Sequence, residues 1–221
     1  MMSCRRLVFV VDDDASFRTA VTRMLTAAGL TVQTFPSASA LLAHLRTEQT
    51  EQTEQMDSPG CVLADLCMPG LDGLQLQEAC ARSGVELPFV FLTGQGDVKS
   101  AVSAMRHGAI DFLDKCAPQH DLLAALERAL ERDARARAAR ARRAQLEQRF
   151  SALTERENEV LAQVVHGRMN KQIAAALGIH ERTVKLHRSA ITTKLGVRSV
   201  AELTSLTRQI GRFEEPQQSC P

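Results

Sequence analysis

Residues 62–73 read Val-Leu-Ala-Asp-Leu-Cys-Met-Pro-Gly-Leu-Asp-Gly, and the organisation of the front half of the chain follows from them. The apolar run before Asp65 is typical of a buried strand. The Met-Pro-Gly and Asp-Gly that follow are turn formers, so the strand must end near this carboxylate. In an open parallel sheet, ligands collect beyond the carboxyl ends of the strands, where Asp65 would lie. The competing interpretation of Asp65 is a turn residue or a helix cap.

Three other apolar runs also end in residues that are suited to chemistry. They are Leu7–Val11 before Asp12 and Asp13, Phe89–Leu92 before Thr93, and Ile110–Leu113 before Lys115. With Thr31–Phe35 they make five predicted strands, and segments of helical periodicity separate them. The alternation predicts an α/β fold with a doubly wound, five-stranded parallel sheet, as in flavodoxin-like proteins. Right-handed crossovers would bring all the strand ends to one edge.

The composition is that of a globular protein with two domains. The chain has 221 residues, of which 44% are hydrophobic and 24% are charged, and this length favours two domains over one. No apolar run approaches the ~20 residues that a membrane span needs, and the first residues lack the pattern of a cleavable signal. The six cysteines form no CxxC pair or Cys/His cluster. We therefore expect reduced thiols in the cytoplasm and no structural zinc.

The net charge of +1 conceals an asymmetry along the chain. Residues 1–126 carry 9 basic and 15 acidic side chains, residues 127–150 carry 8 and 4, and residues 151–221 carry 10 and 7. An acidic front and a basic back suggest different ligands for the two halves. The middle segment consists mostly of Ala, Arg, Glu and Gln, without Gly or Pro. It predicts an exposed helix that continues the last helix of the front domain.

The back of the chain has the pattern of a helix-turn-helix. Thr-Glu-Arg-Glu at 154–157 is a capping box that opens a helix, and Asn170 is the expected cap of a short second helix. Gly178 makes a tight turn before a third helix over about 181–195, which is typical of this DNA-binding motif. A fourth helix is expected over 199–209. The buried face of the third helix would carry Val184, Ile191 and Leu195.

The carboxylates of Asp12, Asp13 and Asp65 are expected to converge at the carboxyl edge of neighbouring strands. Three close carboxylates repel one another unless a cation intervenes, and Mg²⁺ suits carboxylate and carbonyl oxygens. With the ion present, one carboxylate can attack a phosphoryl group. A nearby lysine can then pair with the added phosphate, and a threonine hydroxyl can hydrogen-bond one of its oxygens.

Together these residues resemble the receiver domain of two-component response regulators over positions 7 to about 126. The resemblance rests on Asp12-Asp13, Asp65 with Met68-Pro69 and Asp72-Gly73, Thr93-Gly94 and Lys115. It implies that Asp65 accepts a phosphoryl group from a sensor histidine kinase. It also implies an acidic pocket of Asp12 and Asp13, a Mg²⁺ site of Asp13, Asp65 and the Cys67 backbone carbonyl, and the switch residues Thr93, Phe112 and Lys115.

The sequence departs from this family in one place. The family usually has a cis proline after the lysine, where this chain has Cys116. A non-proline cis bond costs ~3 kcal/mol, so we expect a trans bond here and a less firmly placed Lys115. Asp14 is expected to start the following helix rather than to enter the pocket.

The haloacid-dehalogenase phosphohydrolases are a rival resemblance. They share Asp12-x-Asp14 after a strand, Thr93 at a strand end, and Lys115. That family needs a later acidic strand end to complete its metal site, and this chain has only predicted helices after Lys115. The rival also leaves Asp65 and its Met-Pro unexplained.

The back domain resembles the LuxR-type helix-turn-helix over about Ser151–Leu206. The matching residues are Leu-Thr-x-Arg-Glu at 153–157, Gly-x-x-Asn-Lys-x-Ile-Ala at 167–174, Leu-Gly-Ile at 177–179 and Arg-Thr-Val-Lys-x-His at 182–187. The resemblance implies that Lys185, Leu186 and Ser189 face base edges. It implies phosphate contacts, which hold the register without specifying sequence, from Asn170, Lys171, Arg182, Thr183, His187 and Arg188. Val200, Leu203 and Leu206 are candidates for a dimer surface, although core packing explains them almost as well.

We therefore predict a cytoplasmic response regulator of the NarL/FixJ kind. Its expected parts are a receiver at 5–126, a helical linker at 127–150, a LuxR-type domain at 151–213 and a loose tail at 214–221. Phosphorylation would drive homodimer formation and binding to promoter DNA, with RNA polymerase as a further partner and no membrane contact. The receiver would catalyse only its own phosphoryl transfer and dephosphorylation. The alternative is a phosphorylation-independent transcription factor whose receiver acts as a protein-interaction module.

Overall fold

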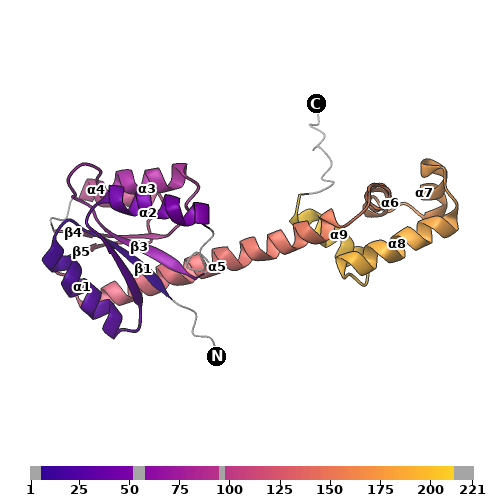
Figure 1. Ribbon diagram of the computed structural model, residues 1–221. Helices are drawn as coiled ribbons and strands as arrows, with labels where there is room; N and C mark the ends of the chain where they lie inside the picture. Colours follow the sequence, from indigo (N-terminus) through magenta and orange to yellow (C-terminus); the bar gives the residue numbers. More distant parts are fainter. Residues whose placement is uncertain (1–5, 52–57, 95–97, 212–221) are drawn as a thin grey trace. The chain divides into compact units, whose positions relative to one another are not determined.

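The computed structural model describes residues 6–51, 58–94 and 98–211 (Figure 1). The chain divides into two compact units, Met1–Ala138 and Ala139–Pro221. The tail expected at 214–221 lies outside the described residues. Within the described ranges, no helix combines the length and the apolar character that crossing a membrane requires.

The front unit is built on a five-stranded sheet. Its strands are β1 (Leu7–Val11), β2 (Thr31–Phe35), β3 (Gly60–Asp65), β4 (Phe89–Thr93) and β5 (Asp111–Asp114). All neighbouring strands are parallel, in the order β2-β1-β3-β4-β5. The predicted doubly wound parallel sheet is thus confirmed. The direction of winding reverses between β1 and β3, which is where ligands bind in such sheets.

Helices cover both faces of this sheet because the strand side chains alternate between two cores. One core joins Phe9 and Val11 to α2 (Ala38–Glu51), α3 (Gly73–Arg82) and α4 (Val98–Arg106). The other joins Val8 and Val10 to α1 (Ala15–Ala27) and to the first half of α5 (Gln119–Ser151). Helices α1 and α5 therefore cover one face of the sheet and α2, α3 and α4 cover the other, as the predicted fold class requires.

The turn after β3 depends on a close approach that only glycine permits. The Gly73 N–H donates to the Leu66 carbonyl oxygen at 3.0 Å, and Asp72 caps α3 just before it. A Cβ atom at residue 73 would lie 2.6 Å from the Asp65 carbonyl oxygen and 3.0 Å from the Phe91 ring. The start of α3 is thereby packed against the end of the strand that carries Asp65.

Helix α5 runs without a break from Gln119 to Ser151, so the predicted continuation through the linker segment is observed. Leu122, Leu126 and Leu130 are buried against the sheet. Near the other end, Leu146 is buried, and Phe150 belongs to the core of the back unit. Large apolar side chains therefore dock the two ends of the helix, and alanine and arginine dominate between them.

After α5, the described part of the back unit contains α6 (Glu155–Val165), α7 (Asn170–Leu177), α8 (Glu181–Leu195) and α9 (Val200–Gln209). The predicted capping box at Thr154 and Glu157 is present. Gly178, with a φ of +64°, joins α7 to α8 through the left-handed region. The buried face of α8 carries Val184, Ile191 and Leu195, as predicted.

One expectation about the back unit was wrong, and another is resolved in part. Asn170 does not cap α7, because Met169 occupies the cap position and Asn170 is the first helical residue. Among the dimer-surface candidates, Leu203 is buried and Leu206 packs against the same core. Core packing explains these two leucines, whereas Val200 is 43% exposed.

Candidate functional site

Asp12, Asp13 and Asp65 meet at the carboxyl edge of the sheet. β1 and β3 are neighbours with Val11 beside Ala64, so the residues that follow each strand end lie close together. One carboxylate oxygen from each of the three residues lies within 4.8 Å of the others. Asp12 and Asp65 are buried, and Asp13 is exposed. The predicted convergence of these carboxylates is confirmed.

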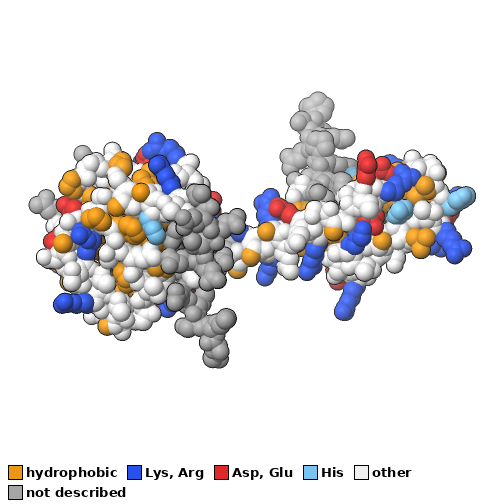
Figure 2. Space-filling model, viewed as in Figure 1, with side chains coloured by type: hydrophobic (Ala, Val, Ile, Leu, Met, Phe, Trp, Pro, Cys, Tyr) orange, Lys and Arg blue, Asp and Glu red, His pale blue; other side chains and the backbone are white. Residues whose placement is uncertain are grey.

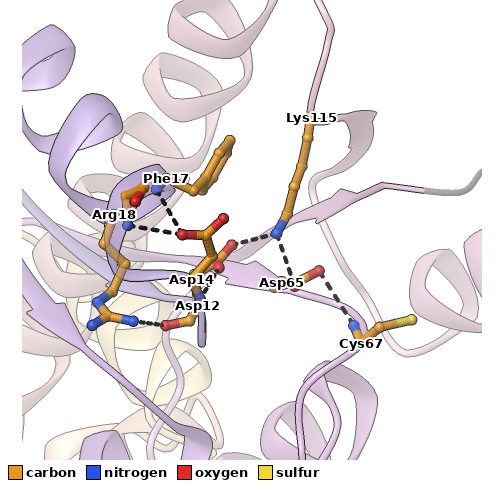
Figure 3. A network of polar contacts seen from close by, with 8 residues as sticks. Asp12, Asp14, Phe17, Arg18, Asp65, Cys67 and Lys115 are labelled. Atoms are coloured by element: carbon orange, nitrogen blue, oxygen red, sulfur yellow. Dashed lines mark hydrogen bonds and ion pairs between the residues drawn. The ribbon is translucent and has the colours of Figure 1, made fainter.

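Lys115 places a positive charge between two of these carboxylates (Figure 3). Its Nζ lies 2.7 Å from Asp12 Oδ2 and 2.9 Å from Asp65 Oδ2, and 4.6 Å from the centre of the Phe17 ring. Burial alone would lower the pKa of the Lys115 ammonium, but the hydrogen bonds and charges of Asp12 and Asp65 together raise the pKa above its ordinary value. Lys115 therefore stays charged at neutral pH and offsets part of the negative charge of the pocket.

Local hydrogen bonds hold the carboxylates in place. The Asp14 N–H donates to Asp12 Oδ1 at 2.9 Å, and the Cys67 N–H donates to Asp65 Oδ1 at 3.3 Å. Asp14 itself caps α1 by accepting from the N–H groups of Ser16 and Phe17. Its expected position at the start of the helix is thus observed.

The loop that carries Lys115 is held in place without a proline directly after the lysine. The peptide bond between Lys115 and Cys116 is trans, as expected. The Cys116 N–H donates to Asp114 Oδ1 at 2.7 Å, and the Ala117 N–H donates to the Asp114 carbonyl oxygen at 2.9 Å. Since Lys115 reaches both carboxylates, the expectation of a loosely placed lysine is not met.

The other predicted switch residues lie on β4, which is the neighbour of β3, and on β5, which is the next strand beyond β4. Thr93 ends β4 and is buried, and its carbonyl oxygen accepts a 2.8 Å hydrogen bond from the Lys115 N–H. Phe112 on β5 lies beside Phe91 and is partly buried against the core. The backbone therefore connects Thr93 directly to the lysine of the pocket.

The donor set of this pocket fits a hard divalent cation. Among the described residues, Asp12, Asp13 and Asp65 are the group that could hold a metal ion. Carboxylate oxygens and water are the ligands that Mg²⁺ prefers, and exposed Asp13 leaves the pocket open to solvent on one side. Cys67, whose carbonyl is the further predicted ligand, is exposed next to Asp65.

The second group of predicted residues lies on the surface of α7 and α8. Exposed side chains of this group are Lys171, Arg182, Lys185, Leu186 and Ser189, and partly buried ones are Asn170, Thr183, His187 and Arg188. Leu186 is 65% exposed although it is apolar. Arg188 donates to Asn170 Oδ1 at 2.8 Å, which ties α8 to the start of α7. On the face of the back unit that Figure 2 shows, Lys and Arg side chains are scattered rather than gathered into one patch.

A buried ion pair supports the start of the helix-turn-helix. Glu157 is 5% exposed, and one of its oxygens accepts 2.7 Å contacts from Lys194 Nζ and from the Thr154 N–H. The hydrogen bond from Lys194 is the largest of the effects that lower the pKa of Glu157. The contact joins α6 to the end of α8 and so helps to hold the exposed face of α8 in place.

The stability of the back unit should fall in acid because of this pair. A carboxyl group with a lowered folded-state pKa stabilises the fold above its unfolded pKa of about 4.3, and this contribution is lost as the pH falls through the folded-state value. Glu157→Gln should lower the free energy of unfolding by about 2 kcal/mol at pH 7 and should flatten its dependence on pH below 5. Hydrogen exchange of the α6 amides in the intact protein measures both effects. The exposed Glu159, which pairs with Arg156, provides the control Glu159→Gln, for which little change is expected.

Sequence reasoning missed Glu157 and Lys194 as a pair and Asp133 as a buried residue. The signal for Glu157 was available in part, because the capping box already assigned a role to its side chain. Nothing in the sequence pairs it with a lysine 37 positions away. Asp133 lies in a segment that reads as a solvated helix, yet it is only 1% exposed.

Comparisons with known proteins agree with both halves of this description. The family model of the response regulator receiver domain matches residues 8–127, and the model of the luxR family of bacterial regulatory proteins matches residues 151–207. Nodulation protein W of Bradyrhizobium diazoefficiens is 39% identical over 209 residues, which are 95% of this chain and 88% of that protein. The transcriptional regulatory protein FixJ of the same organism is 33% identical over 214 residues, which are 97% and 100% of the two chains.

Solved structures give the same assignment. The structure of the response regulator StyR has a TM-score of 0.82 and 44% sequence identity, and the match covers 93% of this chain and 99% of that one. The carboxylate pocket lies in the segment that matches receiver domains, and the α7–α8 surface lies in the segment that matches luxR-type domains. The chain therefore belongs to the two-component response regulators of the NarL/FixJ kind, which regulate transcription through a receiver domain and a LuxR-type DNA-binding domain.

Proposed function

We propose that Asp65 is the phosphoacceptor of this response regulator and that a sensor histidine kinase supplies the phosphoryl group. The observation that carries the proposal is the meeting of Asp12, Asp13 and Asp65 with the ammonium group of Lys115. We propose Mg²⁺ as the cation of the pocket, held by Asp13, Asp65 and the Cys67 carbonyl oxygen. The proposed domain limits are 5–126 for the receiver, 127–150 for the linker and 151–213 for the DNA-binding domain.

The residues of the pocket have distinct parts in this reaction. An Asp65 oxygen attacks the phosphorus of the donor phosphohistidine, the P–N bond breaks, and the imidazole nitrogen keeps the electron pair and takes up a proton. When held by Asp13, Asp65 and the Cys67 carbonyl oxygen, Mg²⁺ would neutralise charge on the phosphoryl oxygens. Lys115 then pairs with one phosphoryl oxygen, and a charge pair at ~4 Å is worth ~4 kcal/mol before desolvation if the effective dielectric constant is about 20. The Thr93 hydroxyl donates a hydrogen bond to a second phosphoryl oxygen.

The response that we propose is a homodimer on DNA. Movement of Thr93 and Phe112 toward the phosphoryl group changes the surface formed by α4 and β5. On α4, Val102 and Met105 are 46% and 49% exposed, which supports an apolar contact surface there. Two tethered DNA-binding domains then bind paired half-sites of a promoter at a raised effective concentration, and RNA polymerase is the further partner.

Labelling with acetyl phosphate tests this function. The intact protein should incorporate one phosphoryl group per chain when Mg²⁺ is present and almost none in excess chelator. Phosphorylation should then increase protection of the promoter DNA in a footprint. If the protein were not labelled at millimolar Mg²⁺ and acetyl phosphate did not change its DNA binding, the alternative would hold: a phosphorylation-independent transcription factor whose receiver acts as a protein-interaction module.

Substitutions on α7 and α8 should separate base contacts from phosphate contacts. Lys185→Ala should weaken binding to the cognate promoter by roughly 10- to 100-fold and reduce discrimination against altered half-sites, because one base contact is worth about 1–3 kcal/mol. Lys171→Ala should weaken binding to all sequences alike and lower the salt slope by about one. Titrations of labelled DNA at several salt concentrations measure both. Arg82→Ala, which removes an exposed receiver charge, is the control and should change neither.

A further inference from the structure

Asp133 is a buried carboxylate in the segment of α5 to which the proposed function assigns no chemistry. Its side chain is only 1% exposed. Its Oδ2 accepts a 2.8 Å hydrogen bond from the Gly60 N–H and pairs with the guanidinium group of Arg137, one turn further along α5. The other oxygen, Oδ1, is buried without a hydrogen-bond partner.

Such a group is an unfavourable way to attach a helix if stability alone matters. A buried carboxylate must be paired and hydrogen-bonded to offset its desolvation, and here a single oxygen receives both contacts. Leu130, one turn earlier, docks the same helix by apolar burial. The specific contact to one backbone N–H fixes the register of the helix on the sheet, which an apolar side chain does less strictly.

Asp133 also lies where apolar docking of α5 ends. Leu130 is buried, but residues 131–145 contain no apolar side chain larger than alanine. The front compact unit ends at Ala138, directly after Arg137. The Asp133 contact therefore attaches to the receiver a stretch of helix that its alanines alone would hold weakly.

The partner of Asp133 on the sheet is part of the phosphoacceptor strand. Gly60 is the first residue of β3 and Asp65 is the last. All six residues of this strand are buried, between β1 and β4. One rigid strand thus carries the proposed phosphorylation site at one end and the attachment of the linker helix at the other.

We propose that Asp133, held by Arg137, is a positioning residue that fixes where α5 leaves the receiver. The proposal rests on phosphorylation of Asp65 as the input. With the contact in place, the linker helix has a defined attachment, so a change in the receiver is passed on to the DNA-binding domain. Without it, residues 131–138 join the free linker, which lengthens by about 12 Å at 1.5 Å per residue. The phosphorylation-dependent gain in DNA affinity then falls, because a longer linker lowers the effective concentration of the second domain.

The test compares three substitutions at this contact with a matched pair on the same helix. Asp133→Ala removes both contacts, Asp133→Asn keeps an acceptor for the Gly60 N–H without the charge, and Arg137→Gln alters only the less buried partner. The control is Glu131→Gln, because Glu131 pairs with Arg135 on an exposed face of α5. Three quantities are measured on the full chain: hydrogen exchange at Gly60, the extent of labelling by acetyl phosphate, and DNA affinity with and without phosphorylation.

The expected results differ among the three measurements. Asp133→Ala should raise the exchange rate at Gly60 by about tenfold, since an opening free energy lower by 1.4 kcal/mol has this effect. Labelling should stay within about twofold of the unsubstituted protein. The ratio of DNA affinities with and without phosphorylation should fall at least threefold, with Asp133→Asn and Arg137→Gln intermediate and Glu131→Gln unchanged.

Two outcomes in the substituted proteins would overturn the positioning role. One is an unchanged affinity ratio in Asp133→Asn and Arg137→Gln while exchange at Gly60 rises, which would make the contact purely structural. The other is a loss of labelling equal to the loss of DNA response, which would place the effect in the pocket. Failure of the proposed function itself is distinguishable, because the unsubstituted protein would then show no effect of acetyl phosphate on DNA affinity. That result would overturn the positioning role as well.

Discussion

Replacing Asp65 with Asn should abolish labelling by acetyl phosphate and remove the effect of the phosphodonor on DNA binding. An amide has almost the shape of the carboxylate, so the packing of β3 should remain. It lacks the nucleophilic anionic oxygen that attacks phosphorus, and it brings one negative charge fewer to the cation site. The loss of labelling should exceed 100-fold, because the reaction then has no nucleophile at this position. Autoradiography of the intact protein after incubation with labelled phosphodonor measures it.

Asp14 provides the matched control for this prediction. It lies two residues from Asp12 and is also a carboxylate, but it is exposed and caps α1. Asp14→Asn should leave labelling within about twofold of the unsubstituted protein and should cost at most about 1 kcal/mol of stability, since Asn is a good helix cap. Equal labelling of Asp65→Asn and Asp14→Asn would show that the phosphoryl group is carried elsewhere.

The sequence was most informative where local pattern and global fold agree. The apolar runs of β1, β3 and β4 are buried on both faces, so they appear in the sequence as continuous apolar stretches. Once the sheet is parallel, the strand ends must share an edge, and the meeting of Asp12 with Asp65 follows from strand order. In the back unit, the positions of the glycines in the turns and the inward spacing of Val184 and Ile191 were enough to predict the helix-turn-helix.

The sequence was least informative about contacts between residues that are distant along the chain. Asp133 approaches Gly60 across 73 positions. Leu130, one turn earlier, is buried, but nothing in the sequence pairs the Asp133 carboxylate with the backbone of β3. Asn170 has the residue type of a helix cap, but Met169 takes that position and the amide oxygen instead accepts from Arg188. In both cases a partner that is distant in sequence decides where the side chain lies: Gly60 for Asp133 and Arg188 for Asn170. This contact overrides the local preference of the residue type, which is a solvated position for Asp133 and a helix cap for Asn170.

The position of the Lys115 side chain could not be predicted from the residue that follows it. The missing proline after it suggested a loosely held side chain, since the loop could not adopt the usual cis bond. The loop is held instead by Asp114, through its side chain and its carbonyl oxygen. The two carboxylates and the ring of Phe17 then orient the ammonium group.

Lys115→Met should weaken both the stability of the receiver and its response. Asp12 and Asp65 are buried, and removing the cation between them leaves two carboxylates facing each other. Loss of one partner of a buried ion pair costs about 3–5 kcal/mol, and we expect about 3 kcal/mol here because the lysine side chain is 21% exposed. Mg²⁺ should stabilise this variant more than the unsubstituted protein, since the ion then faces a less neutralised pocket. Thermal unfolding of the intact protein in chelator and in millimolar Mg²⁺ measures both effects.

In Lys115→Met, the gain in DNA affinity that follows phosphorylation should be reduced more than the phosphorylation of Asp65 itself. Asp65 is still present in Lys115→Met, so acetyl phosphate should label the variant slowly when Mg²⁺ is supplied. The phosphoryl group would lack its cationic partner, and the phosphodonor-dependent gain in DNA affinity should fall at least fivefold, which corresponds to about 1 kcal/mol. Arg128→Met, which breaks an exposed pair with Asp111, should change stability by less than about 1 kcal/mol and leave the gain intact. If Lys115→Met kept the full gain in DNA affinity, the ammonium group would serve only to balance charge in the resting pocket, and the signal would have to pass through Thr93 alone.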